Sequence, residues 1–213
     1  MKNKIKVILV DDHAVVRAGF RMLLSTVADI DVIAEADRGE TACQLYLEQQ
    51  PDVMVLDLSM PGIGGLECLR RICNRDSHAR VLVFSVHDEM VYVDRAINAG
   101  AKGYITKNSA PDILVEAIRK IAGGEIYIEQ GLMKNQPLHN HTDYKAIVDN
   151  LSAREFDIFI RLAKGLTAHK IAEELCLGYK TVANYGTQIR SKFNVSSSVE
   201  LAHIAIALGM MKN

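Results

Sequence analysis

Acidic side chains follow two short apolar runs in the first part of the chain. Asp11 and Asp12 come directly after residues 5–10, and Asp57 comes directly after residues 53–56. Short apolar runs rich in β-branched residues are typical of buried strands, and parallel strands bring their carboxyl ends to one edge of a sheet. Carboxylates gathered at one edge repel one another, so we expect the cluster to serve a cation or a reaction.

Two later apolar runs end in a hydroxyl group and an amine. Residues 81–84 lead to Ser85, and residues 103–106 lead to Lys107. A carboxylate can attack phosphorus to form an aspartyl phosphate, provided that positive charge neutralises the equatorial oxygens. We therefore predict that Asp57 accepts a phosphoryl group. Lys107 is expected to bind one phosphoryl oxygen, and Ser85 to donate a hydrogen bond to another.

Mg²⁺ is the cofactor expected at the acidic cluster, because it prefers hard oxygen ligands and keeps several of its waters. Asp12 and Asp57 are predicted to be direct ligands, and Asp11 to bind directly or through water. The backbone carbonyl of Ser59 is predicted to be a further ligand. The metal ion and the phosphoryl group would then share one site.

The elements that must position these residues alternate in type over the first 125 residues. Apolar residues recur at helical spacing between the apolar runs, as at Leu114, Ala117, Ile118 and Ile121. This alternation predicts a doubly wound, flavodoxin-like α/β fold, with helices on both faces of a five-stranded parallel sheet. Its strands are expected near residues 5–10, 31–35, 52–57, 80–85 and 102–106.

A linker and an all-helical region are predicted after this fold. Residues 125–150 have no sustained period and are interpreted as a linker, with a short helix near residues 143–149. Residues 151–213 are predicted to be a small all-α domain, and residues 1–124 to form the α/β domain. Ser152 with Glu155 and Ser197 with Glu200 have the spacing of capping boxes, which predicts two helix starts.

Two of the predicted helices, near residues 167–175 and 179–192, are separated by a short turn that contains Gly178. Such a pair forms a helix-turn-helix, which places the amino-terminal part of its second helix in the major groove of double-stranded DNA. Asn and Gln can pair with adenine, and lysines can contact phosphates. The residues predicted to face DNA are Lys180, Thr181, Asn184, Tyr185, Thr187, Gln188 and Lys192.

Charge and cysteine content narrow the class of protein. Residues 1–125 carry 15 Lys and Arg against 18 Asp and Glu, a net charge of −3, whereas residues 151–213 carry 8 against 5, a net charge of +3. This difference suggests different partners for the two parts.

The four cysteines have no CxxC spacing, so we expect reduced core thiols, without zinc or disulfides, in a cytoplasmic protein. No stretch approaches the roughly 18 apolar residues that span a bilayer, which argues against a membrane partner.

The first 124 residues resemble the receiver domains of bacterial two-component response regulators. The matching residues are Asp11 and Asp12, Asp57 in DLSMPGIGG, Ser85, and Lys107 in GAKGYITK. The resemblance implies phosphoryl transfer from a sensor histidine kinase and slow self-dephosphorylation, and not the turnover chemistry of an enzyme. It also implies a switch, in which Ser85 turns toward the phosphoryl group and Tyr104 rotates inward behind it.

Residues 151–210 resemble the LuxR-type helix-turn-helix, in LSAREFDIFIRLAKGLTAHKIAEELCLGYKTV, SKFNVSS and VELAHIAI. A receiver followed by this module is the arrangement of the NarL/FixJ class, and the TVANY run is similar to the GacA/UvrY branch. This resemblance implies a regulator that binds promoter DNA, and we expect it to do so as a homodimer when phosphorylated. Ala183 and Thr187 stand where many relatives have lysine, Tyr185 replaces a usual His, and Lys170 replaces a usual Glu. Gly186 falls in the middle of a predicted helix, where it costs about 1 kcal/mol relative to Ala.

Two other functions fit parts of the pattern. The sparse basic residues of the helical region also fit a protein-interaction module, which salt-dependent binding to DNA would exclude. A Mg²⁺-dependent phosphatase would use an aspartyl intermediate as well. Such enzymes have a second acid two residues after the nucleophile, however, and Ser59 stands at that position.

Overall fold

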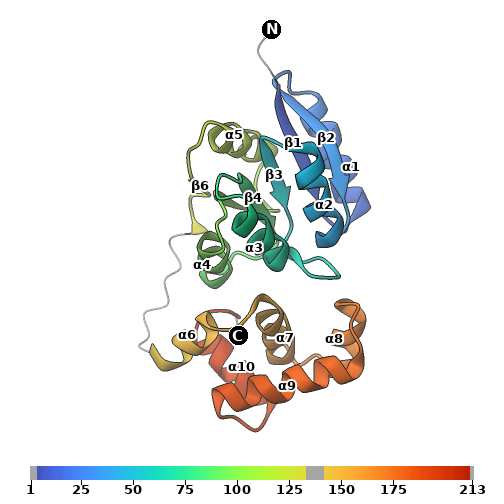
Figure 1. Cartoon of the computed structure of the whole chain (residues 1–213). Coiled ribbons are helices and arrows are strands. Elements are labelled where there is room, and N and C mark those ends of the chain that lie inside the picture. The colour runs from blue at the N-terminus through green and yellow to red at the C-terminus, as the bar shows by residue number, and fades with distance from the viewer. Residues whose placement is uncertain (1–3, 133–141, 212–213) are drawn as a thin grey trace. The chain divides into compact units, whose positions relative to one another are not determined.

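The computed structural model describes residues 4–132 and 142–211, and these residues form two compact units that we describe separately (Figure 1). The first unit contains a parallel sheet of six strands in the order β2-β1-β3-β4-β5-β6. The strands are β1 (Ile5–Val10), β2 (Ile30–Ala36), β3 (Val53–Leu56), β4 (Val81–Ser85), β5 (Gly103–Thr106) and β6 (Tyr127–Ile128). The helices of this unit are α1 (Ala14–Ser25), α2 (Gly39–Gln49), α3 (Gly65–Arg75), α4 (Met90–Asn98) and α5 (Pro111–Ala122).

The central strands are buried along their whole length, and they are largely apolar up to Ser85 and Thr106 at their ends, because both faces of the sheet are covered. Every residue of β3, β4 and β5 is buried, as expected for a parallel sheet between two layers of helices. The core on one face joins Leu24 of α1 and Ile118 of α5 to Leu9 and Val55 of the sheet. The predicted α/β fold is therefore confirmed.

The strand order switches sides between β1 and β3, because β2 lies beyond β1 while β4 to β6 lie beyond β3. These two strands pair in parallel, with Val10 opposite Leu56. The residues that directly follow them therefore lie side by side at the carboxyl edge of the sheet. In doubly wound sheets this is where ligands bind.

The sheet has six strands, where the sequence predicted five. The additional strand, β6, pairs in parallel with β5, and Tyr127 lies opposite Gly103. It falls within residues 125–150, which were interpreted as a linker. A strand of two residues is too short to show a period of two, so its pairing could not be seen in the sequence.

Within residues 142–211, the second unit contains helices and no strand. Its helices are α6 (Thr142–Asp149), α7 (Ala153–Ala163), α8 (Ala168–Glu174), α9 (Tyr179–Phe193) and α10 (Ser198–Ala207). Both predicted capping boxes are confirmed, since Ser152 caps α7 with Glu155 and Ser197 caps α10 with Glu200. In the core, the rings of Phe159 and Phe193 stack with their centroids 4.9 Å apart.

The connection between α8 and α9 has the form of a helix-turn-helix. Cys176 adopts a positive φ of 52° in the turn, and Gly178 precedes the first residue of α9. Cys176 is exposed, so the prediction that all four cysteines are core thiols is wrong for this residue. No helix within residues 4–132 and 142–211 is long and apolar enough to cross a membrane.

Candidate functional site

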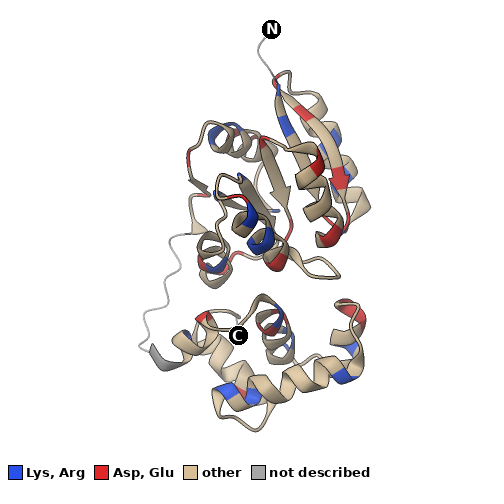
Figure 2. Ribbon diagram, viewed as in Figure 1, with Lys and Arg blue, Asp and Glu red and all other residues tan. Residues whose placement is uncertain are grey.

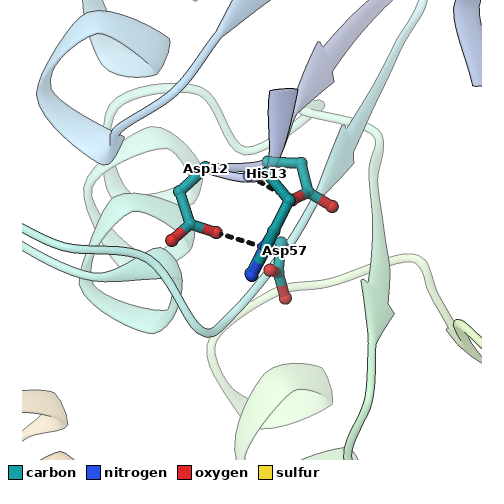
Figure 3. Close-up of side chains that lie close together, drawn as sticks. Asp12, His13 and Asp57 are labelled. Carbon is teal, nitrogen blue, oxygen red and sulfur yellow. Dashed lines mark hydrogen bonds and ion pairs between the residues drawn. The ribbon is translucent and has the colours of Figure 1, made fainter. Parts of the chain in front are cut away.

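The three predicted aspartates gather at the carboxyl edge of the sheet, as Figure 3 shows for Asp12 and Asp57. Asp11 follows β1 and Asp57 follows β3, and both are buried. One side-chain ligand atom from each of Asp11, Asp12, His13 and Asp57 lies within 4.8 Å of the other three. The prediction that adjacent strand ends bring these carboxylates together is confirmed.

Lys107 joins two of the carboxylates from the end of β5. Its Nζ lies 2.5 Å from Oδ2 of Asp11 and 2.8 Å from Oδ2 of Asp57. The backbone N–H of Lys107 donates a hydrogen bond of 2.8 Å to the carbonyl of Ser85, which ties β5 to β4 at this edge. A single ammonium group therefore balances part of the charge of two buried acids.

Burial and charge act in opposite directions on this pair. Burial raises the pKa of Asp57, while the charge of Lys107 and the backbone N–H of Ser59, 3.1 Å from Oδ1, oppose that rise. Burial by itself lowers the pKa of Lys107, but the charges of Asp57 and Asp11 outweigh it, and the pKa is raised. The negative charge of Asp57 thus depends on nearby cations, because little water reaches it.

The donors present at this edge fit a hard divalent cation. Oδ2 of Asp11 and Oδ1 of Asp12 are buried, and each faces a side-chain nitrogen, Nζ of Lys107 at 2.5 Å and Nδ1 of His13 at 2.8 Å. Mg²⁺ binds through one or two carboxylates together with water, and carboxylate oxygens gathered within 4.8 Å of one another suit it.

Two residues at this edge were not identified from the sequence. The Nδ1 of His13 lies 2.8 Å from Oδ1 of Asp12, and its backbone N–H donates to Oδ1 of Asp11 at 2.9 Å. Arg17, one helical turn later, donates from Nη1 to the carbonyl of Asp11 at 2.6 Å. The available signal in the sequence was that His13 directly follows the acid pair and that Arg17 lies one helical turn after His13. These contacts hold the loop after β1 in place.

A third residue, His87, connects the site to the predicted switch. Its backbone N–H donates to Oγ of Ser85 at 3.3 Å, and its carbonyl accepts from the hydroxyl of Tyr104 at 2.9 Å. Its Nε2 lies 3.1 Å from Oγ of Ser59, and its ring stacks on Tyr92 with a centroid separation of 3.9 Å. His87 comes from the loop after β4, and only the fold brings it to Ser59.

Ser85 and Tyr104 are both fully buried in this structure. Tyr104 thus occupies an inward position, with its hydroxyl bonded to the loop that follows Ser85. The hydroxyl of Ser85 accepts from that same loop, through His87. A change in the position of Ser85 would therefore act on the loop to which Tyr104 is bonded.

The second helix of the helix-turn-helix, α9, has one buried and one exposed side. Val182, Ile189 and Phe193 are buried, which confirms that they face the core. The DNA-facing candidates lie on the exposed side, apart from Tyr185, which is half-buried; the exposed ones are Lys180, Thr181, Asn184, Thr187, Gln188 and Lys192. Figure 2 shows basic residues toward both ends of α9 and none in its middle.

Two residues of α9 have contacts that the sequence did not reveal. The Nζ of Lys192 lies 2.7 Å from Oε1 of Glu155, so this predicted phosphate contact has a partner within the chain. Gly186 is buried, and a Cβ at this position would lie 3.5 Å from Cδ1 of Leu162, an ordinary contact distance. The glycine is therefore not required by lack of space.

Both units match known protein families. Residues 7–119 match the response regulator receiver domain, and residues 149–205 match the bacterial regulatory proteins of the luxR family. The chain is 40% identical over 209 residues to the transcriptional activator protein ExaE of Pseudomonas putida, covering 97% of this chain and 98% of that protein. It is 38% identical over 208 residues to the response regulator UvrY of Escherichia coli K12, covering 97% and 95%.

A solved structure agrees with the first unit. The crystal structure of a LuxR-family two-component response regulator from Aurantimonas sp. SI85-9A1 is 39% identical, with a TM-score of 0.60. The match between the two covers 62% of this chain and 94% of the chain in that crystal structure. Since both families match in the units that carry the acidic site and the helix-turn-helix, the chain belongs to the two-component response regulators of the NarL/FixJ class, with a receiver domain and a LuxR-type DNA-binding domain.

Proposed function

We propose that the receiver accepts a phosphoryl group on Asp57, and that this modification controls binding of the second unit to promoter DNA. The observation that carries the proposal is the position of Lys107, whose Nζ bridges Asp11 and Asp57 at 2.5 Å and 2.8 Å. A buried carboxylate beside a lysine and further acids has the charges that phosphoryl transfer requires. The donor is a sensor histidine kinase, and the protein acts in the cytoplasm.

Asp57 acts as the nucleophile in this proposal. One of its oxygens forms a bond to phosphorus as the bond to the donor breaks, and that oxygen must give up its present partner. Oδ1 is held by the N–H of Ser59, and Oδ2 by Lys107. Lys107 then moves onto a phosphoryl oxygen, and the hydroxyl of Ser85 donates to another. In this structure the hydroxyl of Ser85 accepts a hydrogen bond from the backbone N–H of His87, and rotation of the Ser85 side chain toward the phosphoryl group would break that bond.

Mg²⁺ would be held by Asp12 and Asp57, by Asp11 directly or through water, and by the carbonyl of Ser59. When bound, it neutralises charge that develops on the transferred oxygens. The ligand atoms of Asp11, Asp12 and Asp57, which lie within 4.8 Å of one another, support this assignment. His13 is paired with Asp12 and must release it before that oxygen can bind a cation.

The output is dimerisation on DNA. Two copies of α9 on half-sites about one helical turn apart would read a two-fold-related sequence, as helix-turn-helix dimers do. Asn184 and Gln188 on the exposed side of α9 are the candidates for base contacts, and Lys180 for a phosphate contact. Coupling between the two units is expected to be about 1–3 kcal/mol, which is several-fold to a hundredfold in DNA affinity.

Labelling of the full-length protein by a small acyl phosphate with Mg²⁺ tests the acceptor. We expect a mass gain of one phosphoryl group that is lost in Asp57→Asn and kept in Asp37→Asn, which changes an exposed aspartate of the same unit. In Asp12→Ala the labelling rate and the Mg²⁺ affinity should fall while the fold is retained. Full labelling of Asp57→Asn would show that another residue is the acceptor.

A protein-interaction role of the helical unit is the second candidate. It is favoured by the pairing of Lys192 with Glu155 and by the absence of basic residues from the middle of α9. DNA binding predicts that affinity for a promoter fragment falls steeply with salt, because bound phosphates release counterions. Affinity that does not depend on salt or on DNA sequence would favour the second candidate.

A further inference from the structure

Two cysteine thiols lie in contact between neighbouring helices of the receiver. Figure 1 shows α2 and α3 packed together beside the sheet, and residues of the two helices contact each other. The Sγ of Cys43, on α2, lies 3.6 Å from the Sγ of Cys68, on α3. A disulfide bond measures about 2.05 Å, so the sulfurs need to approach by only about 1.5 Å.

The two thiols differ in the way that a redox pair requires. Cys43 is half-buried and Cys68 is fully buried. The hydrogen bond with Cys68 lowers the pKa of Cys43, with burial acting in the opposite direction and the charge of Arg71 adding to the lowering. The same hydrogen bond and burial raise the pKa of Cys68. Cys43 is therefore the thiol that reaches solvent and forms the thiolate, and Cys68 is the thiol held beside it.

We propose that Cys43 and Cys68 are a redox modification site, which a hydroperoxide converts to an intramolecular disulfide. The Cys43 thiolate attacks the outer oxygen of the hydroperoxide and breaks its O–O bond, which gives a sulfenic acid and, after protonation, an alcohol or water. The sulfur of Cys68 then attacks the sulfur of Cys43. The S–O bond breaks, and hydroxide leaves as water with the proton that Cys68 gives up. Two thiols and one hydroperoxide thus give one disulfide, one alcohol or water, and one further water.

The disulfide between Cys43 and Cys68 would link α2 covalently to the first part of α3, next to the loop that follows β3. The first turn of α2 already touches this loop, because a Cβ on Gly39 would lie 2.7 Å from Cγ1 of Ile63 and 3.1 Å from Cβ of Cys68. Glu40 also accepts the backbone N–H of Ile63 at 3.0 Å. Oxidation would therefore fix a contact that the fold makes without a covalent bond. The proposal does not depend on the acceptor role of Asp57.

The experiment uses full-length reduced protein treated with hydrogen peroxide or an organic hydroperoxide, followed by an alkylating agent. We expect the number of free thiols to fall from the four present in the sequence to two. Proteolysis should release a peptide that links Cys43 to Cys68, and a thiol reductant should restore all four thiols. In Cys68→Ala, a sulfenic-acid probe should label Cys43, which can no longer form the disulfide.

Matched variants separate this pair from the other cysteines. Cys73→Ser changes a half-buried thiol of α3, and Cys176→Ser changes the exposed thiol. Both variants should still form the Cys43–Cys68 link, and Cys43→Ser should not. Because Cys68 lies in the core, Cys43→Ser serves as the test if Cys68→Ala does not fold. The proposal is overturned if oxidised wild-type protein yields no linked peptide, or if Cys43→Ser loses two thiols as the wild type does.

Discussion

Gly65, the first residue of α3, is predicted to be essential because no side chain fits beside the phosphoacceptor loop. A Cβ built on Gly65 would lie 2.0 Å from the carbonyl oxygen of Asp57 and 2.6 Å from Cα of Leu58. Both are backbone atoms, so no rotamer change can relieve the contact. The φ of Gly65 is not among the positive values, so the constraint is space and not backbone conformation.

The size of the effect follows from this contact. The shortest ordinary Cβ contact is 3.4 Å, so Gly65→Ala must separate α3 from the backbone of Asp57 by about 1.4 Å. Overpacking of this kind costs about 1–3 kcal/mol, and we expect the upper end because backbone must move. A displacement of about 1 Å at a reacting group costs on the order of a hundredfold in rate. We therefore expect both lower stability and much slower phosphorylation.

The assay follows the mass gain of full-length protein over time with an acyl phosphate and Mg²⁺, together with thermal unfolding of the same sample. Gly19→Ala is the matched control, because Gly19 is an exposed glycine of α1 and a Cβ there meets nothing within 4 Å. The control should be labelled at the wild-type rate and gain up to about 1 kcal/mol in stability. Wild-type rate and stability in Gly65→Ala would refute the reasoning that α3 positions Asp57.

Three further predictions concern the helical unit. Gly186→Ala should raise its free energy of unfolding by up to about 1 kcal/mol in thermal or denaturant unfolding, because a Cβ meets only ordinary contacts. A loss of stability would mean that the space is not available. The second prediction concerns the pKa of Glu155. Burial by itself would raise this pKa, but the hydrogen bonds from Lys192 and Ser152 lower it below its ordinary value of 4.5. Because the pKa is lower in the folded protein, the ionised Glu155 contributes stability above its unfolded pKa, and this contribution is lost as the pH falls. The stability difference between wild type and Glu155→Gln should therefore shrink below about pH 4.5. A difference that does not depend on pH would exclude the ionised contact. Asn184→Ala should relax base preference, whereas Lys180→Ala should weaken all DNA sequences alike and lower the salt slope by about one, and equal effects of both on specificity would contradict the assigned roles.

Local patterns in the sequence were sufficient for β1 to β5, for two helix starts and for the candidate acceptor, but not for β6. Apolar runs and helical spacing located β1 to β5, because strands buried on both faces must be continuously apolar. The capping boxes at Ser152 and Ser197 located two helix starts, because their partners are only three residues away. Parallel order along the chain was then enough to place Asp11, Asp57 and Lys107 at one edge of the sheet.

Contacts between residues far apart in the sequence were decided by the tertiary structure alone. The bridge from Lys107 to Asp57 spans 50 residues, the bond from His87 to Ser59 spans 28, and the contact between Cys43 and Cys68 spans 25. The pairing of Lys192 with Glu155 likewise joins α9 to α7. Side-chain type and spacing specify which groups can reach one edge or face. The atoms that meet there depend on how whole helices and strands pack, to within about an ångström, and no local pattern encodes that packing.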